Sequence, residues 1–457
     1  MSKTFSLANK KNIQLNTPQL LKSGMYLIII SSILLLITTI LGVQKARTAI
    51  KTIGKDSAPS IIAAQRIKDS LADIDANAAN ELIAKPGQNQ DAVKNYEERR
   101  EKVTRFLVTA AENITFGDNE RIPIINLQLG LGDYITKIQQ ARDFHQRGET
   151  AGVLKAYREA AEIMDKKLLP AADALNTANA SVLDRVYNEQ RSASLTSLLL
   201  ILFNGFIILV LLLVMQVFIK RKMRRIINPF LLLATGIAGI FMIYVFANFA
   251  TAYYYLKVAK EDAFKSIDFL RKARSIAYSA NGDESRYLLD NSLAAQHEQA
   301  FYNKINQLVT LPPGQNLDTV VNSIKQNQKV PNFSGYLADA LNNVTFPGEK
   351  EALIENISTL AIYLKIDKKI RQLQQNGKRA EAIALCIGDN PDESNWAFEQ
   401  FRKVNDDALK INQDYFDKSI NQAETEMKNF ETTTGAVIIT ISILTLLGLM
   451  PRIKEYN

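Results

Sequence analysis

The stretch SGMYLIIISSILLLITTILGVQ, residues Ser23–Gln44, contains no charged residue and is almost entirely apolar. At about 1.5 Å per residue, a helix of this length spans the roughly 30 Å hydrocarbon core of a bilayer. Three further charge-free apolar stretches follow along the chain, at Ser192–Ile219, Ile226–Leu256 and Thr432–Pro451. The sequence therefore predicts an all-α membrane protein with four transmembrane helices.

The distribution of cationic residues predicts the side of the membrane on which each segment lies. Three short basic segments fall on one side of a four-span chain: the N-terminal segment with Lys3, Lys10, Lys11 and Lys22, the connection with Lys220, Arg221, Lys222, Arg224 and Arg225, and the tail with Arg452 and Lys454. Short Lys/Arg-rich segments remain in the cytoplasm, so we expect both termini there and two large blocks outside. The first apolar stretch lacks a small-residue cleavage site and is expected to stay as an anchor.

This topology predicts a division of the chain into nine parts. They are a cytoplasmic N-terminus at 1–22, transmembrane helices at 23–44, 192–219, 226–256 and 432–451, extracytoplasmic blocks at 45–191 and 257–431, a basic cytoplasmic loop at 220–225 and a cytoplasmic tail at 452–457. We expect a multi-pass protein of a bacterial cytoplasmic (inner) membrane, in contact with membrane lipid. The net charge of +8 then reflects basic clusters beside anionic lipid, and no nucleic-acid partner is expected.

The hydrophobic periodicity of the first block predicts four antiparallel helices. Steps of three and four residues place one apolar stripe on the first helix: Ala64, Ile67, Leu71, Ile74, Ala78 and Leu82. A second helix is expected at about 91–114, a third ending near Gln146, and a fourth that runs into the second apolar stretch, kinked at Pro170. The prediction is an antiparallel four-helix bundle whose first and last helices continue into the membrane.

The second block repeats parts of the first. The corresponding residues are Asp56, Ser60 and Ile61 with Asp262, Ser266 and Ile267, the motif Asn113–Phe116 with Asn343–Phe346, Tyr134, Arg142, Gly148 and Ala151 with Tyr363, Arg371, Gly377 and Ala380, and Asp173–Leu175 with Asp407–Leu409. The offset grows from 206 residues to about 230 and then to 234, which places an insertion of about two dozen residues between about Asp283 and Pro331. We therefore expect an internal duplication and two tandem four-helix bundles, each flanked by two transmembrane helices.

A membrane helix, an extracytoplasmic four-helix bundle and a second membrane helix resemble the periplasmic sensor half of methyl-accepting chemotaxis receptors. The resemblance covers about residues 20–219 and again about 226–451, and rests on this architecture and on the helical stretch Ala58–Leu82. It implies a homodimer or higher oligomer with coiled-coil packing, sensing of a small molecule or protein, and signal transduction by small shifts of membrane helices. The chain departs from these receptors in carrying no cytoplasmic signalling hairpin, so we expect a separate effector protein to carry the message.

The motifs of enzyme chemistry are missing from the sequence. The two histidines, His145 and His297, fall in different blocks without clustered acids or cysteine at metal-ligand spacing. Cys386 has no sequence partner for nucleophilic catalysis and is expected to be a small buried residue, and as the single cysteine it excludes an intrachain disulfide. No phosphate-binding or nucleophile-elbow motif occurs. We expect no enzyme, no catalytic residue, no metal and no cofactor.

Polar and small residues in the apolar stretches are expected to pack the four membrane helices together. Asn204 and Asn248 are candidates for hydrogen bonds between helices, and Thr235 and Gly239 form a small-xxx-small face. The stretches contain no Asp, Glu, Lys, Arg or His, which disfavours a pump or a proton relay.

The candidate ligand-binding residues are four cations in matching positions of the two blocks. Arg66 and Lys68 lie in the first helix of one block, and Lys272 and Arg274 occupy the same places in the repeat. The resemblance implies a small anionic ligand here, and guanidinium groups suit carboxylates because they present paired donors in one plane. Residues two apart do not share a helix face, so the alternative is four solvated surface cations.

Our leading hypothesis is a non-enzymatic membrane sensor or regulator with duplicated bundles, signalling through a separate effector. The alternative is a structural or scaffold subunit of a membrane or envelope complex. A channel or transporter subunit is a third class, which would need oligomerisation to build a pore.

Overall fold

The computed structural model describes residues 16–223 and 227–456. Five of the basic residues used above to predict topology, Lys3, Lys10, Lys11, Arg224 and Arg225, lie outside the described residues. The described residues are all-α and contain no strand, apart from an isolated antiparallel bridge between Thr310 and Ser334. The predicted fold class is confirmed at this level.

Four continuous helices are long and apolar enough to cross a membrane: Thr17–Ile83, Thr150–Met223, Pro229–Leu289 and Ser394–Lys454. Their parts are α1 (Thr17–Lys51), η1 (Thr52–Ser57) and α2 (Ala58–Ile83), then α5 (Thr150–Ile163), η2 (Met164–Leu168) and α6 (Leu169–Met223), then α7 (Pro229–Lys257), η3 (Val258–Phe264) and α8 (Lys265–Leu289), and finally α14 (Ser394–Met427) and α15 (Phe430–Lys454). Four such helices indicate a membrane protein.

The remaining helices are shorter and polar on one face. They are α3 (Gln90–Glu112), α4 (Asp118–Gln146), the 3-10 turn η4 (Asn291–Leu293), α9 (Ala294–Leu308), α10 (Leu317–Lys325), α11 (Tyr336–Asn342), α12 (Glu349–Gln375) and α13 (Arg379–Ile387). The chain divides into two units. The membrane unit contains residues up to Ala49, Asn188–Tyr254 and the segment from Gln422, and the polar unit contains Ile50–Tyr187 and Tyr255–Asn421.

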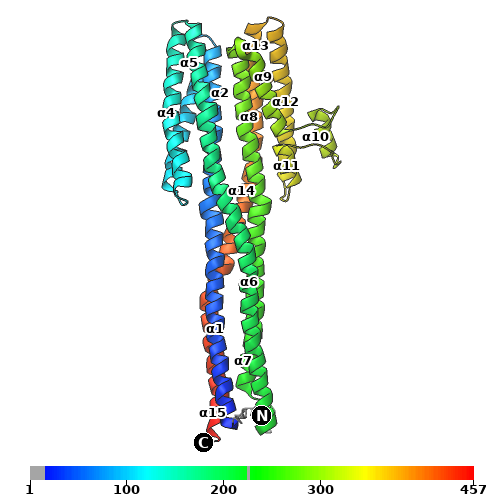
Figure 1. Cartoon of the computed structure of the whole chain (residues 1–457). Coiled ribbons are helices and arrows are strands. Elements are labelled where there is room, and N and C mark those ends of the chain that lie inside the picture. Colours follow the sequence, from blue (N-terminus) through cyan, green and yellow to red (C-terminus); the bar gives the residue numbers. More distant parts are fainter. Residues whose placement is uncertain (1–15, 224–226, 457) are drawn as a thin grey trace, which may run out of the picture. The chain divides into compact units, whose positions relative to one another are not determined.

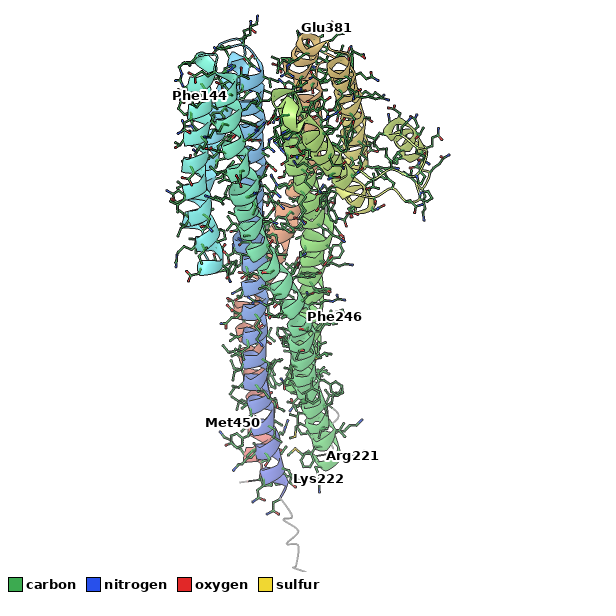
Figure 2. The ribbon with its side chains drawn as sticks, turned by 45° about the horizontal axis from the view of Figure 1, so that its top comes forward. Phe144, Arg221, Lys222, Phe246, Glu381 and Met450 are labelled. Atoms are coloured by element: carbon green, nitrogen blue, oxygen red, sulfur yellow. The ribbon has the colours of Figure 1, made fainter. Side chains whose placement is uncertain are left out.

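The membrane unit consists of α1, the second part of α6, α7 and α15 (Figure 1). Apolar side chains point outward from these helices, as Phe246 and Met450 do in Figure 2, with 55% and 50% of their surfaces exposed. Arg221 and Lys222 lie at the end of α6, at the same end of this unit as the last residues of α15. Lipid tails favour an apolar outer surface, and lipid headgroups favour cations at the end of the helices. Both features are present in this unit.

Hydrogen bonds between the membrane helices confirm part of the predicted packing. Asn204 donates from Nδ2 to a threonine hydroxyl of α1 at 3.4 Å. Asn248, however, donates to a carbonyl of its own helix at 2.8 Å, and no atom beyond the neighbouring residues and backbone of its own helix lies within 4 Å of the position that a Cβ on Gly239 would occupy. Both of these predictions were wrong, because a polar or small residue in the sequence does not show which helix packs against it. Asn228, which we did not predict, donates to a carbonyl of α15 at 2.8 Å.

The first half of the polar unit follows the predicted helices closely. The stripe from Ala64 to Leu82 is buried, with side chains between 0% and 4% exposed. The break after α4 falls at Gly148, whose φ of 72° favours a residue without a Cβ. Just before Pro170, where a kink was predicted, the helix contains the π segment η2, after which the Leu169 amide donates to the Met164 carbonyl. Proline lacks an N–H, and the wider turn accommodates it.

The second half contains an excursion between α9 and α11, residues 309–335, which overlaps the region between about Asp283 and Pro331 where an insertion was predicted. Helices α9 and α11 both pack on α8, and together they take the place that α3 has beside α2. Backbone hydrogen bonds in both directions between Thr310 and Ser334, of 2.7 and 3.2 Å, close the excursion where it leaves α9 and returns to α11. Helix α10 belongs to this excursion and lies to the side of α12 (Figure 1).

The two Asn-Ile/Val-Thr-Phe turns make the same contacts in the two halves. Asn113 donates from Nδ2 to the Ser60 hydroxyl at 2.7 Å, and Asn343 donates to the Ser266 hydroxyl at 3.0 Å. These are the residues that the repeat pairs with each other. The match therefore extends from sequence spacing to individual hydrogen bonds.

A buried glutamate closes each of these turns. Glu120 accepts from two successive turn amides at 2.7 and 2.6 Å, and Glu349 accepts from the corresponding amides at 2.9 and 3.2 Å. The π segments η1 and η3 also begin at corresponding positions, Thr52 and Val258. Both halves thus share a π segment, a helix and a carboxylate-closed turn.

The two halves form one compact unit, because α2 of the first packs along α8 of the second. Figure 1 shows these two helices side by side at its centre. The contact between them positions the site described next.

Candidate anion-binding site

The contact between α2 and α8 is polar and electrostatically complementary. Helix α2 contributes the buried carboxylates Asp69, Asp73 and Asp75, whereas α8 contributes three arginines, Arg271, Arg274 and Arg286. Further hydrogen bonds join the same contact: Gln65 donates to the carboxylate of Asp268 at 2.7 Å, and Ser285 donates to the Asn80 amide oxygen at 2.6 Å. Opposite charges on the two faces favour this pairing of helices and fix their register.

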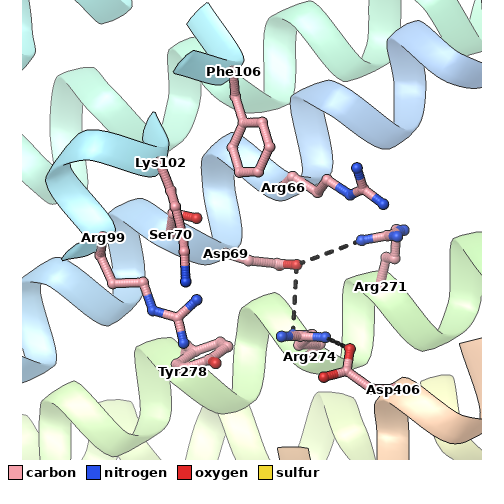
Figure 3. A pocket seen from close by; sticks show the side chains of 10 residues that line it. All are labelled: Arg66, Asp69, Ser70, Arg99, Lys102, Phe106, Arg271, Arg274, Tyr278 and Asp406. Atoms are coloured by element: carbon pink, nitrogen blue, oxygen red, sulfur yellow. Dashed lines mark hydrogen bonds and ion pairs between the residues drawn. The ribbon is translucent and has the colours of Figure 1, made fainter. Parts of the chain in front are cut away.

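A cavity of about 160 Å³ opens along this contact. Helices α2, α3, α8 and α14 contribute to its lining (Figure 3). Its charged residues are the five cations Arg66, Arg99, Lys102, Arg271 and Arg274 and the two carboxylates Asp69 and Asp406. Because the cations outnumber the carboxylates by three, the cavity favours an anion.

Arg271 is the buried cation of this cavity. Only 7% of its surface is exposed, its Nε has no hydrogen-bond partner among the described residues, and its closest carboxylate oxygen, Oδ2 of Asp69, is 4.0 Å away. Burial lowers the pKa of Arg271 to about 10, against the opposing effect of Asp69. The guanidinium therefore stays charged at neutral pH with an unused donor, and a buried donor of this kind costs stability until something accepts from it.

Asp69 and Asp406 hold the arginines of α8 in place. Asp69 lies between Arg271 and Arg274, 3.8 Å from Nε of the latter, and Arg274 forms a close ion pair with Asp406 of α14 (Figure 3). Burial raises the pKa of Asp69 to about 6, and the nearby guanidiniums of Arg274 and Arg271 oppose that rise. Asp69 is still mostly ionised at neutral pH, and together with Asp406 it offsets two of the five positive charges.

The rim of the cavity carries Arg66 and Lys102, both exposed. Neither has a hydrogen bond or ion pair among the described residues, and the Arg66 guanidinium lies 5.9 Å from the centre of the Phe106 ring. Arg99, by contrast, forms an ion pair with Asp73. The cations with unused donors are therefore Arg66, Lys102, Arg271 and, through its Nε, Arg274.

Two of the four predicted ligand-binding residues line this cavity, Arg66 and Arg274, and two lie elsewhere. Lys68 pairs with Asp173 at 2.6 Å, and Lys272 pairs with a carboxylate one turn away on its own helix at 2.7 Å. The separation has a simple cause, since residues two apart on a helix point in different directions.

Arg142 and Arg371, which lie beside the matching glycine turns, form ion pairs with carboxylates on the helices of the polar unit. Arg142 donates to both carboxylate oxygens of Glu81, at distances of 2.7 to 3.0 Å. Arg371 donates to both oxygens of Asp367, at 2.9 and 2.8 Å, and lies over the rings of three aromatic residues.

Cys386 is 1% exposed, as expected for a small core residue. Within the described parts of the chain, no group of three or more His, Cys, Asp or Glu side chains is placed to hold a metal ion.

A second buried cluster joins the two halves further along the same helix pair. Arg286 of α8 contacts Asp75 of α2 at 2.7 Å, Asp165 at 2.9 Å and Asp283 at 3.3 Å, and its Nε donates to the Tyr157 hydroxyl at 3.2 Å. All of its donors are used. This cluster is a structural joint between the halves, whereas the Arg271 cavity has spare donors.

Several residues of the site carried no signal that the sequence analysis used. Arg99 and Lys102 lie in a charge-rich helix of which most residues are solvated, and Arg271 is adjacent to the predicted Lys272. Only the pairing of α2 with α8, and of α3 with α2, brings them to one place.

Residues 49–188 match the family of actinobacterial sensor domains. This segment contains α2 and α3, which supply Arg66, Asp69, Arg99 and Lys102 to the cavity. Comparisons with curated proteins and with solved structures gave no significant match. The match identifies a sensor domain in the first half of the chain, which suggests a sensing role.

Proposed function

We propose that this chain is a non-enzymatic membrane sensor or regulator that binds a small anion in the Arg271 cavity and signals through a separate effector protein. The observation that carries the proposal is the position of the cavity. Its cations come from the sensor-domain segment on one side and from α8 on the other, and α14 contributes the carboxylate Asp406. An anion bound there contacts both halves of the polar unit at once.

The unused donors of the cavity favour the binding of an anion. A buried guanidinium with an unused donor gains a charge-assisted hydrogen bond when an anion enters, and such bonds contribute about 1.5–3 kcal/mol. The exposed cations Arg66 and Lys102 add attraction during approach. A carboxylate or phosphate group fits a cavity of about 160 Å³.

The route for the signal is the continuity of the helices. Helices α2, α8 and α14, which line the cavity, are parts of three of the four long helices that extend into the membrane unit. The π segments η1 and η3 lie in two of them, and single wide turns of this kind are frequent at functional sites because they can shift register. A ligand drives such a shift only if it binds the two helix arrangements unequally.

In this proposal the polar unit is extracytoplasmic and both termini are cytoplasmic, in a bacterial cytoplasmic membrane. The chain acts as a homodimer or higher oligomer, and a partner protein supplies the output. The two halves of the polar unit descend from one duplicated bundle, which explains the matching turns closed by Glu120 and Glu349.

The binding test uses the full-length protein in lipid nanodiscs and titration calorimetry with inorganic phosphate and with sulfate. We expect saturable binding to the wild type. We expect Arg66→Gln to weaken it about tenfold, since about 1.4 kcal/mol corresponds to a factor of ten. Lys68→Gln is the matched control, because Lys68 is paired with Asp173 outside the cavity, and it should bind like the wild type. Equal affinities of both variants and the wild type would refute the site.

The test of signalling is crosslinking in native membranes, followed by affinity purification and mass spectrometry. Recovery of a protein with a kinase, phosphatase or related output domain supports the sensor. Recovery of envelope or membrane-complex proteins alone would favour a structural subunit.

A further inference from the structure

A second hollow of about 360 Å³ adjoins the Arg271 cavity and differs from it in chemistry. The two share Arg99, Lys102 and Tyr278 in their linings, so they are neighbouring parts of one surface depression between the halves. Its lining continues along α2, α3, α8 and α14 away from Arg271. We call it the amide groove.

The amide groove is lined by an unusual number of asparagines: Asn77, Asn80, Asn95, Asn281 and Asn395. Each carboxamide both donates and accepts hydrogen bonds. Four of them use part of this capacity within the protein, whereas Asn95 is exposed and has no hydrogen bond among the described residues. An array of groups that donate and accept matches a ligand whose own groups do both, which hydroxyl groups do.

Tyr278 stands where the two hollows meet. Its side chain is buried, with 3% of the residue surface exposed, and its hydroxyl has no hydrogen-bond partner among the described residues. Together with Nε of Arg271, Nε of Arg274 and Oδ1 of Asp69, it gives the combined depression four buried polar atoms without a hydrogen-bond partner among the described residues. Burying such groups without hydrogen-bond partners costs free energy, which indicates that a ligand supplies the missing partners.

Two of the four carboxylates that line the amide groove are paired within the protein. Glu399 pairs with Arg402 through contacts that include one of 2.6 Å, and Asp73 pairs with Arg99 while accepting from Asn77 at 2.8 Å. The lining also contains Glu98 and Asp389, which have no hydrogen bond or ion pair among the described residues. Hydroxyl groups of a ligand can donate to these carboxylates and to the amide oxygens, and can accept from the amide nitrogens.

We propose that the ligand is a hydroxyl-rich acid, of the sugar-acid or sugar-phosphate class. Its acid group binds at Arg271 and Arg66, and its hydroxylated body lies in the amide groove against Tyr278. This inference rests on the anion site of the proposed function and adds the class of ligand. It also explains why the depression changes from cationic to amide-lined along its length.

The experiment is a calorimetric titration of the full-length protein in nanodiscs with five groups of probes. They are a panel of hexuronates, a panel of hexose phosphates, the corresponding neutral hexoses, inorganic phosphate, and glutamate as an acid with an ammonium group. We expect at least one hexuronate or hexose phosphate to bind ten times more tightly than inorganic phosphate and than its own neutral hexose.

Two variants separate the two ends of the site. Arg66→Gln should weaken both inorganic phosphate and the sugar acid, whereas Asn95→Ala should weaken the sugar acid about threefold or more and leave inorganic phosphate unchanged. Asn303→Ala, an exposed asparagine outside the groove, is the matched control and should change neither.

The outcomes distinguish this inference from the proposed function. If inorganic phosphate binds as tightly as every sugar acid and Arg66→Gln still weakens it, the anion site stands and the ligand class is wrong. If glutamate binds more tightly than all sugar acids, the body of the ligand carries an ammonium group and the ligand class is again wrong. If no anion binds at all, both fail.

Discussion

Replacing Glu284 with glutamine should make the polar unit more stable at pH 8 and leave it almost unchanged at pH 4.5. Glu284 of α8 is fully buried, and one of its oxygens accepts from the Ser394 hydroxyl at 2.7 Å while the other has no partner. Burial first, and then the neighbouring carboxyl of Asp367, raise the pKa of Glu284 from 4.5 to about 8. The other ionisable groups that face it are Arg371 and Tyr363 of α12 and the Cys386 thiol of α13.

The magnitude follows from linkage. At about 1.4 kcal/mol per pKa unit, a change from 4.5 to about 8 corresponds to about 5 kcal/mol. Because the pKa of Glu284 is raised in the folded state, its favourable contribution is complete below pH 4.5 and is lost as the pH rises toward 8. Glutamine keeps the shape and removes the titration, so the variant escapes this loss.

The assay is thermal unfolding in nanodiscs, followed by intrinsic fluorescence, from pH 4.5 to pH 8. At about 2 °C per kcal/mol for a unit of this size, Glu284→Gln should have a Tm about 10 °C above the wild type at pH 8. Glu355→Gln is the control, since Glu355 is exposed on α12. A difference between variant and wild type that does not change with pH, or a lower Tm of Glu284→Gln at pH 8, would refute the reasoning.

Three further substitutions test contacts that stabilise the fold. Arg286→Met should destabilise the polar unit by about 3–5 kcal/mol because it leaves Asp75 buried without its partner, and the lowered Tm should recover in part when Asp75→Asn is added. Gly54→Ala should cost about 1–3 kcal/mol, since the new Cβ would lie 2.5 Å from Cγ2 of Ile420. In Tm measurements the cost should shrink in an Ile420→Ala background, and equal costs in both backgrounds would disprove the contact. Glu120→Ala should cost about 1–3 kcal/mol by leaving two turn amides unpaired, and a Tm equal to that of the wild type would show that the turn does not need the carboxylate.

The sequence predicted the helical class because its signals are local. Ser23–Gln44 is apolar over a whole bilayer thickness, and the stripe from Ala64 to Leu82 recurs at helical spacing. The repeat also paired Asn113 with Asn343, and in the structure they donate to the corresponding hydroxyls of Ser60 and Ser266. Each of these signals depends on residues close in the chain or on a constant offset.

The sequence predicted only part of the site, because its signals are local. Arg66 and Arg274 were identified as cations at matching positions, and both line the cavity. Lys68 and Lys272 were identified by the same argument and lie elsewhere, because the spacing of cations does not say which helix faces them. The sequence did not show which carboxylates Lys68 and Lys272 pair with.

By itself, the sequence determined that this protein is helical, that four helices are apolar enough to span a membrane, and that its two halves share turns and spacing. Hydrophobic periodicity and chain-local turn chemistry carry that information. Tertiary structure alone decided that α2 lies along α8, so that the carboxylates of one half meet the arginines of the other. Arg271 becomes a buried cation with an unused donor only through that contact, since burial and the distance to Asp69 arise from residues about two hundred positions apart.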